Sequence, residues 1–306
     1  MDNGYDIDWL SGIFCAVITP IHADGTNRLD EKSFENVIEH VLQGGVDGLV
    51  VMGSAGEYPC FDRAEKLKAI KRAIDVNKGR VPIVVGTGSP NYHTVIDEVH
   101  MAKDLGAKAA LVAPPFYYPV NAREIEHYYE RIASETGFPI IIYNIPSYTK
   151  ISINCESVVH LSKVENIIGI KDTSRDFLNL QQLLLNVNRR ENVFKIFLGT
   201  DAMLLAGCQM GVDGVISISC NFDPRLDVDL WNACKKENFN AALHIQDKIL
   251  KLFALLRGGT FPSALKSAVA MLGITNNAPC FPVLPLEKKQ EVALRIRLKE
   301  LGYEIG

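Results

Sequence analysis

The sequence lacks the features that mark several common classes of protein. Its 306 residues include seven cysteines, an odd number, and no two of them are spaced as C-x-x-C. It has no lysine- or arginine-rich block, and its formal net charge is −4 at pH 7. Phosphate binding needs a basic stripe, so nucleic acid is not expected as a partner. The cysteine pattern favours a reduced, cytoplasmic protein.

Segments that would direct the chain to a membrane are also missing. The first twelve residues, MDNGYDIDWLSG, are acidic and polar, whereas a signal peptide begins with a basic region followed by an apolar one. No apolar run approaches the roughly 20 residues that a membrane span needs. We therefore expect neither export nor membrane insertion.

Motifs for cofactors and metals are absent as well. The GTGSPN segment, 86–91, follows an expected strand, but Asn91 stands where a dinucleotide fingerprint has its third glycine. There is no Walker A sequence, and the seven histidines show neither H-x-H nor H-E-x-x-H spacing. The sequence therefore predicts no nucleotide cofactor and no metal site.

What the sequence does contain is a regular alternation of two periodicities. Eight short, apolar, β-rich runs are each followed by a longer segment with helical spacing. The expected strands are 13–19, 48–53, 81–86, 109–114, 139–144, 167–172, 193–199 and 214–219. The expected helices lie near 31–44, 62–77, 91–105, 122–136, 154–162, 176–189, 201–210 and 224–236. Nearly continuous apolar strands indicate a parallel sheet buried on both faces.

Strictly alternating strands and helices are compatible with a doubly wound sheet or with a closed barrel. Eight units before residue 240 favour the second, an α/β fold of the (β/α)8 TIM barrel type. Residues 1–236 are the predicted barrel. Residues 237–306 read as helical with no clear strand, and we expect them to form a C-terminal helical extension.

In such a barrel the active site lies at the C-terminal ends of the strands. The polar side chains expected there include one amine, Lys171, which directly follows the apolar run of the sixth strand. The others are Ser54, Glu57, Tyr117, Tyr118, Tyr143, Asn144, Tyr148, Asp172, Thr200, Asp201 and Ser217. This set holds several tyrosines and no histidine.

These side chains suit a reaction in which a lysine attacks a ketone. A neutral lysine amine forms a Schiff base, and the protonated imine then withdraws electrons from the adjacent carbon. Burial at the barrel mouth favours the neutral amine. The phenol of Tyr143 would transfer protons, and the hydroxyl of Ser54 would link two tyrosines into a relay.

The same residues also have purely structural interpretations. Lys171 would be a structural ammonium if it paired with Asp172 or Glu57. Tyr143 would be a wall residue whose hydroxyl finds a partner, as buried tyrosines usually do. Ser54 would belong to a tight turn between strand and helix.

Three segments resemble one known family. G-S-A-G-E (53–57), Y-N-I-P-S (143–147) and G-I-K-D-T (169–173) are similar, in order and spacing, to motifs of the dihydrodipicolinate synthase / N-acetylneuraminate lyase family. The resemblance runs from the AVITP segment, 16–20, to the PSALK segment, 262–266. It implies a (β/α)8 barrel with a C-terminal helical extension, usually assembled as a homotetramer.

The resemblance implies roles for individual side chains. Lys171 would form the Schiff base with pyruvate or another 2-keto acid, and Tyr143 would be the general acid and base. Ser54 would take the place of the threonine or serine of the relay. Tyr117 would match the relay tyrosine that enters the neighbouring subunit's site, although the residues alone also allow loop packing or a subunit contact.

Backbone groups have implied roles as well. The N–H groups of Ser54 and Ala55 would hold the pyruvate carboxylate, and Ile216 would present its backbone carbonyl toward the lysine. Because the covalent imine does the work of an electron sink, the resemblance implies no separate cofactor.

Departures from the family pattern bear on the substrate. Tyr148 stands where the synthase branch has an arginine that binds the carboxylate of its aldehyde, and a phenol cannot replace a bidentate guanidinium. Ala55 replaces a second threonine. Ala202 and Ile218 stand where the sialic acid lyase branch has an acidic residue and a serine. The pattern is closest to that of the 2-keto-3-deoxy sugar acid aldolases.

The sequence thus predicts a class I, metal-independent aldolase. It would cleave or form a 2-keto-3-deoxy sugar acid, or a related 4-hydroxy-2-keto acid, from pyruvate and an aldehyde. Thr200 and Asp201 would bind sugar hydroxyls, and Lys150 offers a cation in place of the missing arginine. Two alternatives remain: a 4-hydroxy-tetrahydrodipicolinate synthase that condenses pyruvate with aspartate semialdehyde, and a catalytically inactive protein that binds a keto acid.

Overall fold

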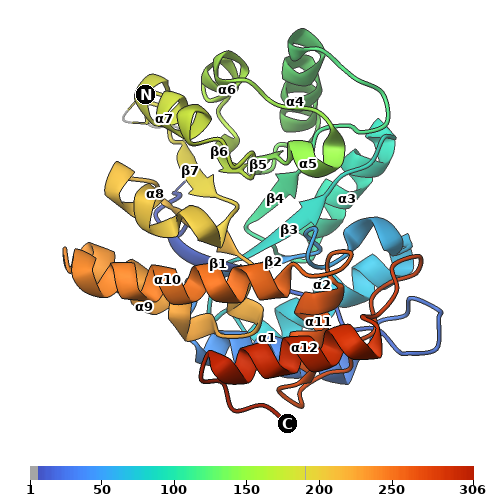
Figure 1. The fold of residues 1–306 in the computed structure, drawn as a ribbon. Helices are drawn as coiled ribbons and strands as arrows, with labels where there is room; N and C mark the ends of the chain where they lie inside the picture. The colour runs from blue at the N-terminus through green and yellow to red at the C-terminus, as the bar shows by residue number, and fades with distance from the viewer. Residues whose placement is uncertain (1–5, 190) are drawn as a thin grey trace.

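The computed structural model of the protein describes residues 6–189 and 191–306. Eight parallel strands follow one another around a closed barrel, and the first pairs with the last (Figure 1). The strands are β1 (Gly12–Ala16), β2 (Gly48–Val51), β3 (Ile83–Thr87), β4 (Ala109–Val112), β5 (Ile140–Asn144), β6 (Ile167–Asp172), β7 (Lys195–Leu198) and β8 (Gly214–Ser217). Every strand residue except Lys195 is buried. The predicted (β/α)8 barrel is therefore confirmed.

The helices that cover the barrel lie where the helical spacing predicted them. They are α1 (Glu31–Gln43), α2 (Arg63–Asn77), α3 (Tyr92–Asp104), α4 (Ala122–Thr136), α6 (Cys155–Leu161), α7 (Phe177–Asn186), α8 (Leu204–Met210) and α9 (Pro224–Lys235). In α1, the side chains of Phe34, Val37, Ile38 and Val41 form one buried face, and Asp30 caps the first turn. Apolar spacing and a capping residue thus fix both the orientation and the start of this helix.

The structure adds three short helical turns that the sequence did not predict, η1 (Tyr58–Cys60), α5 (Pro146–Thr149) and η3 (Ser219–Asn221). A fourth short turn, η2 (Asp201–Met203), forms the start of the helix expected near 201–210 and leads directly into α8. Each follows the C-terminal end of a strand, namely β2, β5, β7 and β8. They therefore surround the mouth of the barrel, where the site is expected.

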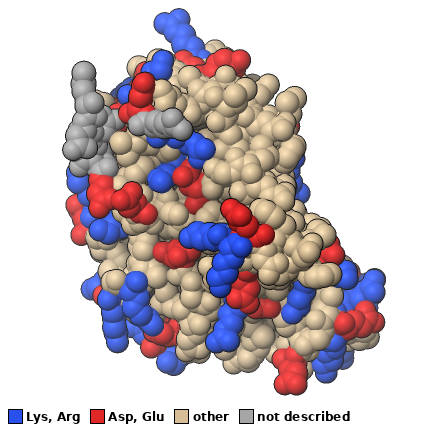
Figure 2. All heavy atoms as spheres, turned by 90° about the vertical axis from the view of Figure 1, so that its left-hand side faces the viewer, with Lys and Arg blue, Asp and Glu red and all other residues tan. Residues whose placement is uncertain are grey.

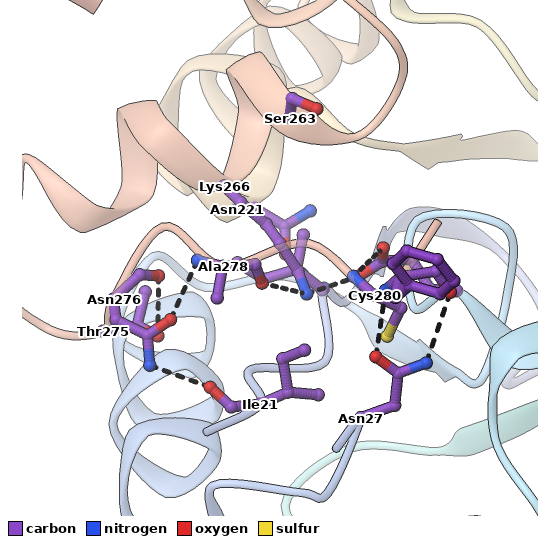
Figure 3. A network of polar contacts seen from close by, with 12 residues as sticks. Ile21, Asn27, Asn221, Ser263, Lys266, Thr275, Asn276, Ala278 and Cys280 are labelled. Atoms are coloured by element: carbon purple, nitrogen blue, oxygen red, sulfur yellow. Dashed lines mark hydrogen bonds and ion pairs between the residues drawn. The ribbon is translucent and has the colours of Figure 1, made fainter. Parts of the chain in front are cut away.

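The C-terminal part of the chain contains three helices, α10 (Phe239–Leu256), α11 (Ser263–Ala270) and α12 (Lys288–Glu300). They lie beside α9 on one side of the barrel (Figure 1). The segment after α11 contacts the loop that follows β1. The Asn276 side-chain amide donates to the backbone oxygen of Ile21 at 2.9 Å, and the backbone N–H of Phe281 donates to the side chain of Asn27 at 2.9 Å (Figure 3). These contacts bring C-terminal residues to the barrel mouth.

Surface charge, helix composition and the state of the cysteines are relevant to the expectations about nucleic acid, membranes and redox state. On the face shown in Figure 2, acidic and basic side chains are interspersed. Among the described residues, none of the helices combines the length and the apolar character that a membrane crossing requires. All seven cysteines are free thiols.

Candidate active site

Lys171 lies near the C-terminal end of β6, opposite Tyr143 of β5, and both side chains are buried. Its Nζ donates to the Tyr143 hydroxyl at 3.3 Å and lies 4.4 Å from the centroid of the same ring. The Tyr143 hydroxyl is 3.2 Å from Oγ of Ser54, which follows β2. Three residues that the sequence singled out on separate strands therefore form one continuous series of polar atoms.

The structure removes the main structural interpretation of Lys171. Of its two candidate partners, Glu57 forms its ion pair with Lys266. The other, Asp172, accepts a hydrogen bond from the side-chain amide of Asn144 at 2.7 Å. Lys171 has no ion pair within residues 6–189 and 191–306. A buried lysine without a counter-ion is rare unless it has a chemical role.

Gly199, directly after β7, leaves the space that the lysine side chain occupies. A Cβ at residue 199 would lie 3.0 Å from Cε of Lys171 and would overlap the hydroxyl of Thr173. The hydroxyl oxygens of Thr173 and Thr200 are buried and have no hydrogen-bond partner in the described part of the chain. Sequence reasoning named Thr200 and missed Thr173, which lies beside the lysine. Neither threonine is among the residues that line the cavity at the barrel mouth, so a role in substrate binding stays a prediction.

A cavity of about 250 Å³ opens beside these polar atoms. It is lined mainly by aromatic and other apolar side chains from the loops at the barrel mouth. The lining residues are Ser54, Glu57, Tyr58, Pro59, Cys60, Phe116, Tyr143, Ile145, Tyr148, Thr149, Phe261, Pro262 and Val283. Ser54 and Tyr143 connect the cavity to Lys171. Phe261, Pro262 and Val283 belong to the C-terminal part, which sequence reasoning did not place at the site.

The turn after β2 offers backbone donors to a ligand. No described residue accepts a hydrogen bond from the backbone N–H of Ser54 or of Ala55. Consecutive backbone N–H groups in a turn are a common binding place for anions. The turn therefore has the donors that a carboxylate needs, next to the Ser54 hydroxyl.

Tyr117 lies outside the cavity of its own chain. It is 84% exposed, its backbone is left-handed at φ 92°, and its ring packs against Tyr118 with centroids 5.1 Å apart. Its neighbour Phe116 lines the cavity instead. Within one chain, the structure does not bring Tyr117 to Ser54 or Tyr143.

Two further predicted residues are buried. The Asp201 carboxylate accepts hydrogen bonds from the N–H groups of Ile218 at 3.2 Å and Ser219 at 2.8 Å. It holds the turn after β8, and its role toward sugar hydroxyls stays a prediction. Ile216 is buried in β8 opposite Phe14 of β1, and the role of its carbonyl stays a prediction.

The metal prediction concerns clusters of ligating side chains. In the described ranges, no group of three or more histidine, cysteine, aspartate or glutamate side chains is placed to hold a metal ion. What the barrel mouth does contain is a lysine, a tyrosine and a serine beside an apolar cavity. A (β/α)8 barrel with this arrangement defines a lyase of the barrel aldolase class.

Comparison with known proteins specifies the family. The model of the "Dihydrodipicolinate synthetase family" matches residues 9–301. The chain therefore belongs to this family, as the three sequence motifs indicated, and it is an aldolase of that family.

Relatives within the family carry two different names. The chain is 32% identical over 290 residues to the "Probable 2-dehydro-3-deoxy-D-pentonate aldolase YjhH" of Escherichia coli K12, covering 94% of this chain and 95% of the relative. It is also 32% identical to the 4-hydroxy-tetrahydrodipicolinate synthase of Nitrosospira multiformis, covering 97% of both chains. Among solved structures, it is similar to YagE, a prophage protein of the dihydrodipicolinic acid synthase family from E. coli K12 in complex with pyruvate. The TM-score is 0.91 at 29% identity, covering 95% of this chain and 98% of that one.

Proposed function

We propose that the protein forms a Schiff base between Lys171 and pyruvate, and that it cleaves or forms a 2-keto-3-deoxy sugar acid or a related 4-hydroxy-2-keto acid. One observation carries the proposal: a buried lysine whose amine has a phenol, and no carboxylate of the described residues, as its hydrogen-bond partner. The pyruvate named for the YagE complex supports the choice of keto acid.

In the cleavage direction, the Lys171 amine adds to the C2 ketone, the Tyr143 phenol supplies one proton, and water leaves, which gives a protonated imine. The resulting Tyr143 phenolate then accepts the proton of the 4-hydroxyl, and the bond between C3 and C4 breaks. Its electron pair moves into the imine, so the aldehyde departs and an enamine remains. Protonation at C3 and hydrolysis release pyruvate and the free lysine. The imine serves as the electron sink, so the proposal calls for no metal and no separate cofactor.

The proton route includes Ser54, which is 3.2 Å from the Tyr143 hydroxyl. We propose that Tyr117 of a neighbouring subunit completes this route in a homotetramer. Two features support this: the tyrosine is exposed in its own chain, and its backbone holds a left-handed conformation that is rare outside glycine. A cytoplasmic location remains a prediction from the cysteine pattern.

A second function has equal support from the relatives. The synthase reaction condenses pyruvate with aspartate semialdehyde through the same imine, and one of the relatives at 32% identity is named for it. A coupled assay with aspartate semialdehyde distinguishes the two, because only the synthase turns that aldehyde over at a useful rate.

The test of the proposed function is chemical trapping. The protein is incubated with pyruvate, reduced with sodium borohydride, weighed and mapped by peptide mass. We expect one stable adduct on Lys171, no adduct in Lys171→Ala, and an unchanged adduct in Lys150→Ala, which alters an exposed lysine at the end of α5. A panel of 2-keto acids assayed for pyruvate release then identifies the substrate. An adduct that survives Lys171→Ala would refute the proposal.

A further inference from the structure

Two arginines near the cavity form no ion pair with any acidic side chain in the described part of the chain. Arg175 lies in the loop between β6 and α7, four residues after the lysine, and Arg257 ends α10. The ion pairs of the described arginines involve other residues of the chain. Neither guanidinium is therefore held in an ion pair by the residues that the structure describes.

Aromatic rings connect the two arginines to the cavity wall. The guanidinium carbon of Arg257 lies 5.3 Å from the ring centroid of Phe261, which lines the cavity, and 5.5 Å from that of Phe253. The guanidinium carbon of Arg175 lies 5.7 Å from the centroid of the same Phe253 ring. Both guanidiniums thus contact the Phe253 ring, and cation–π contacts of this kind favour a defined guanidinium position.

Two carboxylates that could compensate Arg175, its sequence neighbour Asp176 and the nearby Asp201, have other partners. Asp176 caps α7 by accepting hydrogen bonds from Leu178 and Asn179. Asp201 holds the turn after β8. Partial burial and the nearby charge of Arg257 lower the pKa of Arg175, as expected for two cations that repel each other. An anion between them would relieve this repulsion.

Tyr148 lies near both an aromatic neighbour of Arg257 and the cavity in which the aldehyde would bind. Its ring lies 6.5 Å from that of Phe261, and it lines the cavity. Burial raises the pKa of its phenol, and the adjacent charges of Arg257 and Arg175 oppose that rise. Tyr148 occupies the place of the synthase arginine in the sequence, but the structure supplies two guanidiniums beside it from elsewhere in the chain.

We propose that Arg175 and Arg257 form an anion-binding subsite for the aldehyde part of the substrate. The inference rests on the proposed function and narrows it: the aldehyde carries a terminal carboxylate or phosphate. The cavity extends from Ser54 and Tyr143 to Tyr148 and Phe261. A diacid or a phosphorylated 4-hydroxy-2-keto acid would thus place its ketone at the lysine and its second anion at the arginines. Arginine suits this role because its donors match both groups bidentately.

The experiment measures condensation with pyruvate for three aldehydes of equal carbon number: glyceraldehyde, glyceraldehyde 3-phosphate and tartronate semialdehyde. We expect kcat/KM for one of the two acidic aldehydes to exceed that for glyceraldehyde about 10-fold or more. Arg257→Gln and Arg175→Gln should each lower this preference about 10- to 100-fold, mainly through the KM of the aldehyde. Arg257→Lys keeps the charge without the planar guanidinium, and its preference for the acidic aldehyde should lie between those of the wild type and Arg257→Gln. Whichever acidic aldehyde is preferred identifies the anion.

The matched control is Arg297→Gln, which removes an exposed arginine of α12 and should leave the preference unchanged. Borohydride trapping with pyruvate alone is run on every variant, so that a misfolded protein is recognised by the loss of its adduct. The preference among the three aldehydes is measured on the wild-type protein, so this part of the test does not depend on any variant folding. An adduct on Lys171 without any preference for an acidic aldehyde would overturn the subsite and leave the proposed function intact. Absence of the adduct would overturn both.

Discussion

Glu57 and Lys266 form an ion pair in which neither side chain is more than 4% exposed. Glu57 lies three residues after Ser54, and its carboxylate also accepts a hydrogen bond from the backbone N–H of Cys280 at 2.8 Å. Lys266, in α11, donates a second hydrogen bond to the Ala278 carbonyl at 3.0 Å (Figure 3). The pair thus joins the C-terminal helices to the turn that carries the Ser54 hydroxyl.

Breaking this ion pair should destabilise the protein strongly. Lys266→Met leaves the Glu57 carboxylate buried without a counter-charge, which costs about 3–5 kcal/mol in the free energy of unfolding. The double variant Glu57→Gln with Lys266→Met should recover part of that loss. Urea unfolding measures both values. Arg297→Gln, which breaks an exposed pair with Glu300, should cost less than about 1 kcal/mol. Equal losses in the buried and exposed pairs would contradict this account.

Removing the Tyr143 hydroxyl should affect catalysis much more than folding. Tyr143→Phe keeps the ring over the lysine amine and deletes the atom that contacts both Lys171 and Ser54. We expect kcat for pyruvate release to fall about 10²- to 10⁴-fold, since a positioned acid or base contributes that much. Ser54→Ala should lower kcat by a smaller factor, because the Ser54 hydroxyl contacts the lysine only through the Tyr143 phenol. Tyr303→Phe, which loses a hydroxyl bonded to Asp223, is the control and should retain its kcat.

The sequence predicted the barrel and the three central residues for the same reason. Nearly continuous apolar strands of similar length require burial on both faces, and a closed order of eight strands fixes which strand ends meet. Lys171 and Tyr143 lie at two of those ends and Ser54 follows a third, so topology brings them to the same mouth of the barrel. The turns η1, α5 and η3 were not predictable, because three or four residues are too few to show a helical period.

The rest of the site depends on packing that strand order does not encode. Arg257 and Phe261 reach the mouth only because the C-terminal helices pack beside the barrel. Thr200 and Asp201 are adjacent polar residues and looked equivalent in the sequence. In the structure, the Asp201 carboxylate accepts hydrogen bonds from the turn at Ser219, whereas the Thr200 hydroxyl has no partner among the described residues. Because Tyr148 stands where the synthases have an arginine, the sequence predicted that this cation is lost. The fold, however, places Arg175 and Arg257 near the same cavity from two other segments.

Cys60 should be the most reactive cysteine. It lines the cavity, and a hydrogen bond with the Cys280 thiol lowers the pKa of Cys60 to about 7, whereas burial raises the pKa of Cys208 and Cys234. We expect iodoacetamide to label Cys60 first, at a rate that rises through about pH 7 because the thiolate is the nucleophile. Peptide mapping identifies the site, and Cys280→Ala should move the midpoint of the rate to higher pH. Earlier labelling of any other cysteine would show that this thiol pair is not formed in solution.

Asp227 should make the protein less stable as the pH rises. It is completely buried in α9, and burial together with the charge of Asp201 raises the pKa of its carboxyl well above the ordinary value. Above about pH 4 the unfolded chain releases this proton while the folded chain keeps it. The folded state then binds more protons, so the free energy of unfolding falls with pH until the folded carboxyl also ionises.

Asp227→Asn removes this linkage. The variant should therefore have a higher Tm than the wild type at pH 7 to 8, and the difference should vanish toward pH 4, where the wild-type carboxyl is protonated in both states. Asp229→Asn, an exposed aspartate of the same helix, provides the matched control and should leave the pH dependence unchanged. Thermal unfolding followed by circular dichroism across this range gives the comparison. A difference in Tm that grows as the pH falls would mean that Asp227 is ionised in the folded protein, with a stabilising partner.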